Sequence, residues 1–120
     1  MKQPVNFFKS LSDPTRLRIL MLLLRKSLCV CQISFILGME QSRISHQLRI
    51  LRNADLVEGN RKGKWMFYKV PEVEKNKLEF IFTRIIGDTF MASEEITGDY
   101  EKLKAFQKTS LRNCSVSIER

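Results

Sequence analysis

The chain has 120 residues, 43% of them hydrophobic, and a formal net charge of +8, which allows one compact domain with a modest core. Its longest apolar run, residues 19–24, is too short to span a bilayer, and its three cysteines are too few for a disulfide scaffold, so we expect a reducing cytoplasm and no membrane partner. Residues 1–70 carry a net charge of +9 and residues 71–120 carry −1, which predicts polyanion binding by the first part of the chain.

Two helices are predicted before residue 27. Apolar residues recur at helical spacing between residues 5 and 11 and predict a short first helix. A second helix is predicted to start at Asp13 and Pro14, because Asp13 can cap it and Pro14 suits the first helical position, where no N–H bond is formed. It is expected to end near Arg25 and to be buried, since it is apolar on most sides.

The next two predicted helices form a helix-turn-helix. Residues 29–37 predict a short third helix, and Gly38 is a good helix terminator. A fourth helix is predicted over residues 41–55, where apolar residues at spacings of four and three mark a buried face. Two helices joined by a tight Gly-containing turn, the second with a basic polar face, are typical of proteins that enter the DNA major groove.

The outward face of the predicted fourth helix carries hydrogen-bond donors and positive charge but no acidic residue. Such a face suits the major groove, where base edges and phosphates offer mostly acceptors, whereas an ordinary surface helix usually mixes both charge signs. A solvated surface helix is the alternative. The residues expected to contact DNA from this helix are Gln41, Ser42, Arg43, Ser45, His46, Gln47 and Arg49.

Residues 56–70 predict a β-hairpin with a basic tip. Residues 56–58 and 65–70 are rich in aromatic and β-branched types and are expected to be the two strands, joined by a Gly-rich turn at 59–64. A hairpin directly after a helix-turn-helix is expected to be a wing, although a solvated turn is the alternative. The wing residues expected to reach phosphate or a minor groove are Arg61, Lys62 and Lys64.

The rest of the sequence predicts a dimerisation helix and a tail. An apolar stripe at helical spacing runs from residue 72 to about 90, and a weaker stripe follows between residues 96 and 106. A domain this small has little core left to cover these stripes, so we expect a second copy to cover them. Packing across the chain's own domain is the alternative. The predicted division is a winged-helix domain at 1–108, with its dimerisation helix from about 72, and a flexible tail at 109–120.

Several motifs, occurring in a fixed order, make the chain resemble a known family. They are residues 8–20 (FKSLSDPTRLRIL), 28–33 (LCVCQI), 41–48 (QSRISHQL), 54–57 (ADLV) and 62–68 (KGKWMFY). Over about residues 5–70 the chain resembles the ArsR/SmtB family of bacterial and archaeal metal-responsive winged-helix repressors. The resemblance implies a fold that is mostly α with a β-hairpin, in the order α-α-α-α-β-β-α. It also implies a homodimer that binds double-stranded operator DNA without metal and dissociates from the DNA when an ion binds.

The chain departs from the family pattern at two places near the recognition helix. Ser45, His46 and Gln47 stand where the family usually reads Ser-Arg-His, which affects the target sequence more than the activity. Asp55 stands where the helix exit usually has Gly, and Asp accepts a left-handed conformation less readily. A second ion site of the zinc-sensing type is excluded, because residues 72–106 contain no His and the one His of the chain, His46, lies on the predicted DNA-facing side.

Cys29 and Cys31 lie in a segment that resembles the metalloid-binding box of the family's arsenic sensors. Residues two apart in a regular helix point about 200° apart, so one ion would reach both only if the start of the helix were distorted. Such a distortion, just before the recognition helix, is the expected switch. Thiolates select soft ions, so the expected effector is As(III) or Sb(III), with Cd(II), Pb(II) or Zn(II) as alternatives, and no cofactor is required.

A third sulfur is expected from Cys114, because Ser34 occupies the position where arsenic sensors can carry a third cysteine; an idle thiol is the alternative for Cys114. For Cys29 and Cys31 the alternatives are two small buried hydrophobic residues or a redox sensor in the same repressor, with Lys26 lowering a thiol pKa. An enzyme is not expected, since the sequence shows no nucleophile–base pair, paired carboxylates or Gly-rich phosphate loop.

Overall fold

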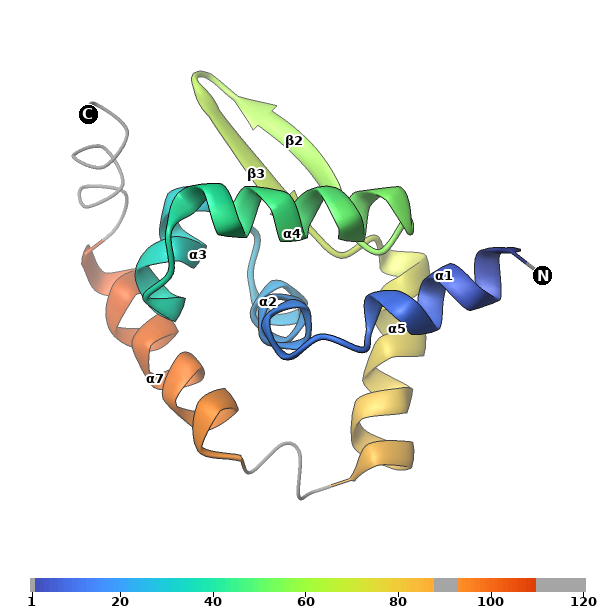
Figure 1. Ribbon diagram of the computed structural model, residues 1–120. Coiled ribbons are helices and arrows are strands. Elements are labelled where there is room, and N and C mark those ends of the chain that lie inside the picture. Colours follow the sequence, from blue (N-terminus) through green and yellow to red (C-terminus); the bar gives the residue numbers. More distant parts are fainter. Residues whose placement is uncertain (1, 88–92, 110–120) are drawn as a thin grey trace.

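The computed structural model describes residues 2–87 and 93–109 and confirms a mostly α fold with a β-hairpin (Figure 1). No helix within these residues is long and apolar enough to cross a membrane. In chain order the elements are α1 (Lys2–Ser10), α2 (Pro14–Arg25), β1 (Leu28–Cys29), α3 (Val30–Leu37), α4 (Gln41–Asn53), β2 (Glu58–Lys62), β3 (Trp65–Lys69), α5 (Glu72–Phe80), the π-helix η1 (Ile81–Ile86) and α7 (Glu94–Thr109).

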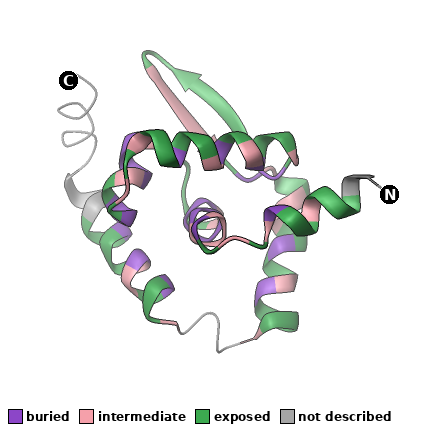
Figure 2. Ribbon diagram, viewed as in Figure 1, coloured by how far each residue is buried: buried purple, intermediate pink, exposed green. Residues whose placement is uncertain are grey.

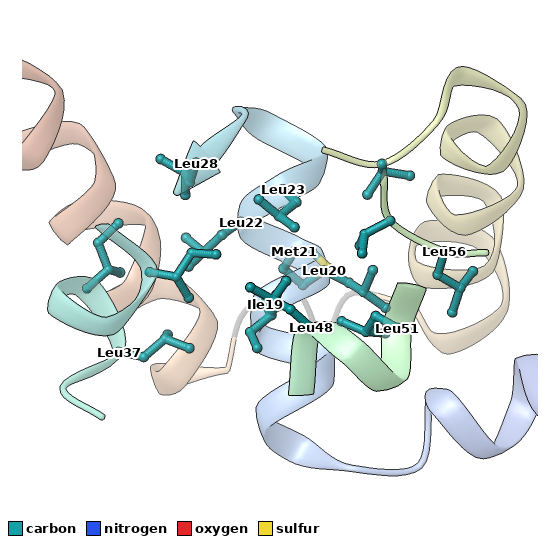
Figure 3. Close-up of a cluster of buried hydrophobic side chains, with 14 of the residues drawn as sticks. Ile19, Leu20, Met21, Leu22, Leu23, Leu28, Leu37, Leu48, Leu51 and Leu56 are labelled. Atoms are coloured by element: carbon teal, nitrogen blue, oxygen red, sulfur yellow. The ribbon is translucent and has the colours of Figure 1, made fainter. Parts of the chain in front are cut away.

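Helix α2 lies at the centre of the fold, with α4, α5 and α7 arranged around it (Figure 1). It starts as predicted, because the Asp13 carboxylate accepts a hydrogen bond of 3.1 Å from the backbone N–H of Arg16 and Pro14 occupies the first helical position. Ile19 and Leu20 are fully buried, and Figure 3 shows their side chains close to Leu48 of α4. The core is therefore built around α2, and α4 is one of its walls.

The sheet has three strands in the order β1-β3-β2, all antiparallel. Strand β1, which the sequence did not predict, pairs Leu28 with Tyr68 and Cys29 with Phe67. The predicted hairpin is present, but its first strand begins at Glu58 and continues to Lys62. The six-residue tip expected at 59–64 is therefore too long, and residues 56 and 57, expected in a strand, are buried in the core instead.

The region after the wing differs in part from its prediction. The helix expected from 72 to about 90 is α5 followed by η1, which ends at Ile86; residues 88–92 lie outside the described residues. Within the first stripe, Leu78 and Phe82 are buried in the chain's own core. The end of the apolar stripe is nevertheless exposed, because Ile85 and Ile86 lie on the surface.

Helix α7 packs on its own domain rather than leaving the second apolar stripe for a partner. Ile96 and Leu103 are buried in the main core, and Asp99 is 97% buried and bridges to Arg18 of α2 with two bonds of 2.9 Å. For this stripe the alternative prediction, packing across the chain's own domain, describes the structure. The tail predicted at 109–120 starts at the last residue of α7, and the rest of it lies outside the described residues.

Candidate nucleic-acid interface and cysteine pair

Helix α4 presents one polar face to solvent along its whole length (Figure 2). Its apolar face is fixed in the core because Ile44, Leu48 and Leu51 are completely buried. Side chains pointing the opposite way are exposed, as predicted, and they comprise Ser42, Arg43, Ser45, His46 and Arg49. Gln41 and Gln47 lie on the two flanks and are half-buried. The turn that leads into α4 is fixed by Gly38, whose φ of 67° is left-handed, as expected of a glycine that ends a helix.

His46 and Arg49 form a hydrogen-bonded pair on the exposed face of α4. The guanidinium nitrogen Nη2 of Arg49 lies 2.8 Å from Nδ1 of His46. A guanidinium only donates, so Nδ1 accepts and a neutral His46 carries its proton on Nε2. The pair therefore offers N–H donors from both residues, which suits the acceptor atoms of guanine edges and phosphates.

Two of the predicted DNA-contacting residues also contact α2. Gln47 accepts a hydrogen bond of 2.8 Å through Oε1 from Nη1 of Arg16. Arg43 donates from Nη2 to Oγ1 of Thr15 across 3.4 Å. Arg16 was not singled out from the sequence, and its position 31 residues before Gln47 leaves no local pattern that would identify it.

The wing carries three exposed basic side chains, as predicted: Arg61, Lys62 and Lys64. The ammonium nitrogen of Lys62 lies 5.7 Å from the centroid of the Phe67 ring, and that of Lys64 lies 5.7 Å from the centroid of the Trp65 ring. Both distances are within the range of a cation–π contact. The lysines are therefore placed over the aromatic side chains of strand β3.

The sulfur atoms of Cys29 and Cys31 lie 3.4 Å apart and are both buried. The predicted helix start was wrong by one residue: Cys29 is the last residue of β1 and has an extended backbone, and α3 begins at Val30. Gln32 caps this start, because its Oε1 accepts a bond of 3.0 Å from the Cys29 N–H. The 200° separation expected for two helical residues therefore does not apply, and the two sulfurs meet without any unwinding.

The environment of Cys29 is apolar. Trp65 and Phe67 of strand β3 pack against the two cysteines. Burial raises the pKa of the Cys29 thiol, and hydrogen bonds from nearby backbone groups, Gln32 first, offset this effect only in part. A raised pKa keeps the thiol protonated at neutral pH and makes it a poor target for oxidants.

The sulfur pair has a spacing that one thiophilic ion could share. With bonds of about 2.3 Å, the length of a zinc–thiolate bond, two sulfurs 3.4 Å apart subtend about 95° at the ion. That angle is narrower than tetrahedral and suits a pyramidal trivalent centre. In the described part of the chain, no group of three or more His, Cys, Asp or Glu side chains could hold an ion. Cys114, the predicted third ligand, lies outside the described residues.

The position proposed for a third cysteine in the same helix has a different role here. The hydroxyl of Ser34 donates a hydrogen bond to the backbone carbonyl of Met39. Met39 lies in the turn between α3 and α4, so Ser34 stabilises that turn. Ser34 is therefore a structural residue of the helix-turn-helix.

Comparisons with known proteins point to one family of transcriptional regulators. The model of the arsR family of bacterial regulatory proteins matches residues 13–59. A transcriptional repressor SmtB homolog from Synechocystis is 41% identical over 71 residues, covering 59% of this chain and 54% of the relative. The arsenical resistance operon repressor of Bacillus subtilis is 39% identical over 72 residues, covering 59% of this chain and 69% of the relative. The match thus spans about half the length of the first of these relatives.

The fold also has a counterpart among solved structures. A homodimeric winged helix-turn-helix DNA-binding domain from Mycobacterium bovis, described as a possible ArsR-family transcriptional regulator, superposes with a TM-score of 0.67. The two chains are 25% identical, and the superposition covers 78% of this chain and 86% of the other. These relatives are named as transcriptional regulators, and none of the three is named as an enzyme.

Proposed function

The chain belongs to the ArsR/SmtB family of winged-helix transcriptional repressors, and we propose that it is a homodimeric repressor whose hold on operator DNA is released by a thiophilic ion. The observation that carries the proposal is the pair of buried sulfurs, Cys29 and Cys31, 3.4 Å apart at the start of α3. Helix α3 is joined to α4 by a three-residue turn, so ligation at the sulfurs acts next to the predicted reading helix.

DNA binding is supported by the two exposed basic elements. In this proposal α4 lies in the major groove and presents the donors of His46 and Arg49, while Lys62 and Lys64 of the wing contact phosphate. All of α4, from residue 41 to 53, lacks acidic residues. The first 70 residues, which contain both elements, carry a net charge of +9, whereas residues 71–120 carry −1.

Dimerisation is supported by an apolar surface on α1, α5 and η1. The two helices α1 and α5 are neighbours, because Nζ of Lys77 lies 5.0 Å from the centroid of the Phe7 ring. The large apolar side chains exposed on these three elements are Val5, Phe8, Val73, Phe80, Ile85 and Ile86. A second copy that covers this surface would form a symmetric dimer, and two reading helices would then match two half-sites.

A trivalent ion such as As(III) or Sb(III) is the effector that the sulfur pair fits best. Soft thiolate ligands exclude hard, oxygen-seeking ions. The narrow angle at a shared ion favours a pyramidal centre, and such a centre needs a third sulfur, which we assign to Cys114. Cd(II), Pb(II) and Zn(II) are the competing effectors. The redox alternative is supported by Cys31, which is disulfide-bonded in the structure. It is opposed at Cys29, because burial raises the pKa of that thiol and so lowers its thiolate fraction.

The direct test is a fluorescence-anisotropy titration on a DNA fragment from the protein's own upstream region. It is run with reduced protein at fixed salt, because affinity for DNA depends strongly on salt. Arsenite, antimonite, Cd(II), Pb(II) and Zn(II) are then added one at a time. We expect release by arsenite or antimonite at the lowest concentration, and release by none of the five ions would refute the proposed effector class.

Two variants separate the parts of this proposal. The double variant Cys29→Ser/Cys31→Ser should bind the same DNA with unchanged affinity and should no longer be released by arsenite.

Phe80→Glu places a charge in the apolar surface on α5 and should shift the sedimentation coefficient toward that of a monomer. Dimers that persist in this variant would move the interface to another surface.

A further inference from the structure

The buried sulfur pair contacts the wing directly. Strand β1 places Cys29 opposite Phe67 in the register of β3, and both Trp65 and Phe67 pack against the two cysteines. The side chains of Trp65 and Phe67 lie on the same side of β3 because they are two residues apart in a strand. The wall of the proposed ion site is therefore made of wing residues.

The same two aromatic rings also support the basic residues of the wing. The ammonium groups of Lys62 and Lys64 each lie 5.7 Å from a ring centroid, Lys62 over Phe67 and Lys64 over Trp65. Each ring that packs against the cysteines thus also lies near the ammonium group of a phosphate-binding candidate. This series of contacts, from the sulfurs to the rings and from the rings to the ammonium groups, involves no residue of α3 beyond Cys31.

We propose that Trp65 and Phe67 are positioning residues that form the wall of the ion site and transmit its occupancy to Lys62 and Lys64 of the wing. This inference rests on the proposed function and adds a second route to release, besides the one through α3 and α4. The physical reason is close packing. An ion bound to the two sulfurs adds volume beside the rings that pack against them, and a packed site responds by displacing side chains rather than by compressing.

Displacement of the rings has a defined consequence for DNA affinity. Strand β3 is anchored on its other face, because Tyr68 packs against the main core. The rings therefore move relative to a fixed strand, and the cation–π contacts that hold the lysines over them are lost. Lysines that are no longer held in place bind phosphate at a higher entropic cost, so the contribution of the wing to binding falls.

The first measurement uses Trp65, the one tryptophan of the chain, as a reporter. Reduced protein is titrated with arsenite while ligation is followed by the ultraviolet absorbance of the sulfur–arsenic bonds and the wing by indole fluorescence. We expect the fluorescence to change with the same midpoint as the absorbance and to stay constant in Cys29→Ser/Cys31→Ser. Ligation with no change in fluorescence would overturn the inference.

The second measurement compares arsenite-induced release in wing variants. Lys62→Ala/Lys64→Ala lacks the contacts that the ion is proposed to break, so we expect weaker DNA binding without the ion and at least about a fivefold smaller drop in affinity on adding arsenite. The matched control is Lys69→Ala, which removes a lysine of the same hairpin that pairs with Glu58 at 3.8 Å; within the described residues, the cation–π contacts to the Trp65 and Phe67 rings come from Lys64 and Lys62 instead. It should keep the full arsenite effect.

The outcomes distinguish this inference from the function on which it rests. If arsenite ligates and releases DNA equally well from the wild type and from Lys62→Ala/Lys64→Ala, the wing route is wrong and the proposed function stands. If arsenite gives no absorbance change and no release, the proposed function fails, and the inference fails with it. Both lysines are exposed, so these substitutions test coupling without disturbing the core.

Discussion

Arg16 donates a hydrogen bond of 2.8 Å from Nη1 to Oε1 of Gln47 and so joins the start of α2 to the exposed helix α4. The rest of the same guanidinium binds the end of α1, where Nε donates to the carbonyl of Ser10 and Nη2 to that of Lys9. One side chain thus connects three helices. Because the side-chain carbonyl of Gln47 faces Arg16, the side-chain N–H groups of Gln47 are the part that can donate to DNA.

This orientation predicts how Gln47 contributes to operator preference. Gln47→Glu keeps an acceptor for Arg16 but removes the amide donors. We expect the ratio of affinities for operator and scrambled DNA to fall about tenfold, the discrimination typical of a base contact. Anisotropy at one salt concentration measures both affinities, and the uniform loss from the added negative charge cancels in their ratio. Asn53→Asp adds the same charge at the end of α4 and serves as the control. An unchanged ratio in Gln47→Glu would show that Gln47 only positions the helix.

The bridge between Arg18 and Asp99 predicts an asymmetric loss of stability. The side chain of Asp99 is 4% exposed and that of Arg18 is 22% exposed. Arg18→Met leaves the more buried charge without its partner and should lower the free energy of unfolding by about 3 kcal/mol. Asp99→Ala leaves a guanidinium that reaches solvent and should lower it by about 1–2 kcal/mol.

Urea unfolding of both variants checks this order. The control pair is Lys75 and Glu72, which lie 4.0 Å apart with Glu72 largely exposed. Glu72→Gln should change stability by less than about 0.5 kcal/mol. A larger loss for Asp99→Ala than for Arg18→Met would contradict the proposed origin of the asymmetry.

Substitutions at Asp55 and Gly38, which follow two helix ends with a left-handed backbone, should change the free energy of unfolding in opposite directions. Asp55 follows α4 with a φ of 61°, and Gly38 follows α3 with a φ of 67°. Asp55→Gly should raise the free energy of unfolding by about 0.5 kcal/mol, because glycine adopts the left-handed region without strain. Gly38→Ala should lower it by about 1 kcal/mol. No atom lies within 4 Å of a Cβ added at Gly38, so backbone conformation alone causes that loss.

Thermal or urea unfolding measures both changes, and the double variant should show their sum because the sites lie on different helices. A loss of stability in Asp55→Gly would mean that the Asp55 side chain makes a stabilising contact that outweighs its strain.

The parts of the fold that follow local chemistry could be predicted from the sequence. Asp13 and Pro14 mark the start of α2 because capping involves only neighbouring residues. Gly38 marks the turn of the helix-turn-helix for the same reason, since its left-handed backbone is a local requirement. The exposed basic face of α4 followed from spacing alone.

The parts that depend on distant residues could not be predicted. Strand β1 has two residues and exists only because β3 pairs with it, which also places Cys29 outside the helix and beside Phe67. The bond between Arg18 and Asp99 joins residues 81 positions apart. Without it, the sequence alone did not decide whether the second apolar stripe packs on its own domain or on a second copy. The sequence therefore identified the cysteine pair but not its geometry or its contact with the wing.

The raised pKa of Cys29 predicts a pH dependence that separates arsenite from divalent ions. Burial favours the protonated Cys29 thiol, so Cd(II) must displace a proton from Cys29 when it binds. Through Cys29 alone, the Cd(II) concentration needed for DNA release should fall about tenfold for each pH unit between pH 6 and 8, since release of a proton is favoured as pH rises. Arsenous acid reacts differently, because each thiol proton leaves with an arsenic-bound hydroxyl as water.

Arsenite release should therefore be nearly independent of pH over the same range. Anisotropy titrations at pH 6, 7 and 8 measure both dependences on one DNA fragment, and the ion-free affinity at each pH is the reference. Cys29→Ser should weaken Cd(II) release and reduce its slope by about one proton per binding event, because one ionisable ligand is gone. A Cd(II) slope near zero, together with arsenite release that weakens as pH rises, would show that Cys29 is already a thiolate at neutral pH. In that case the redox alternative would gain support.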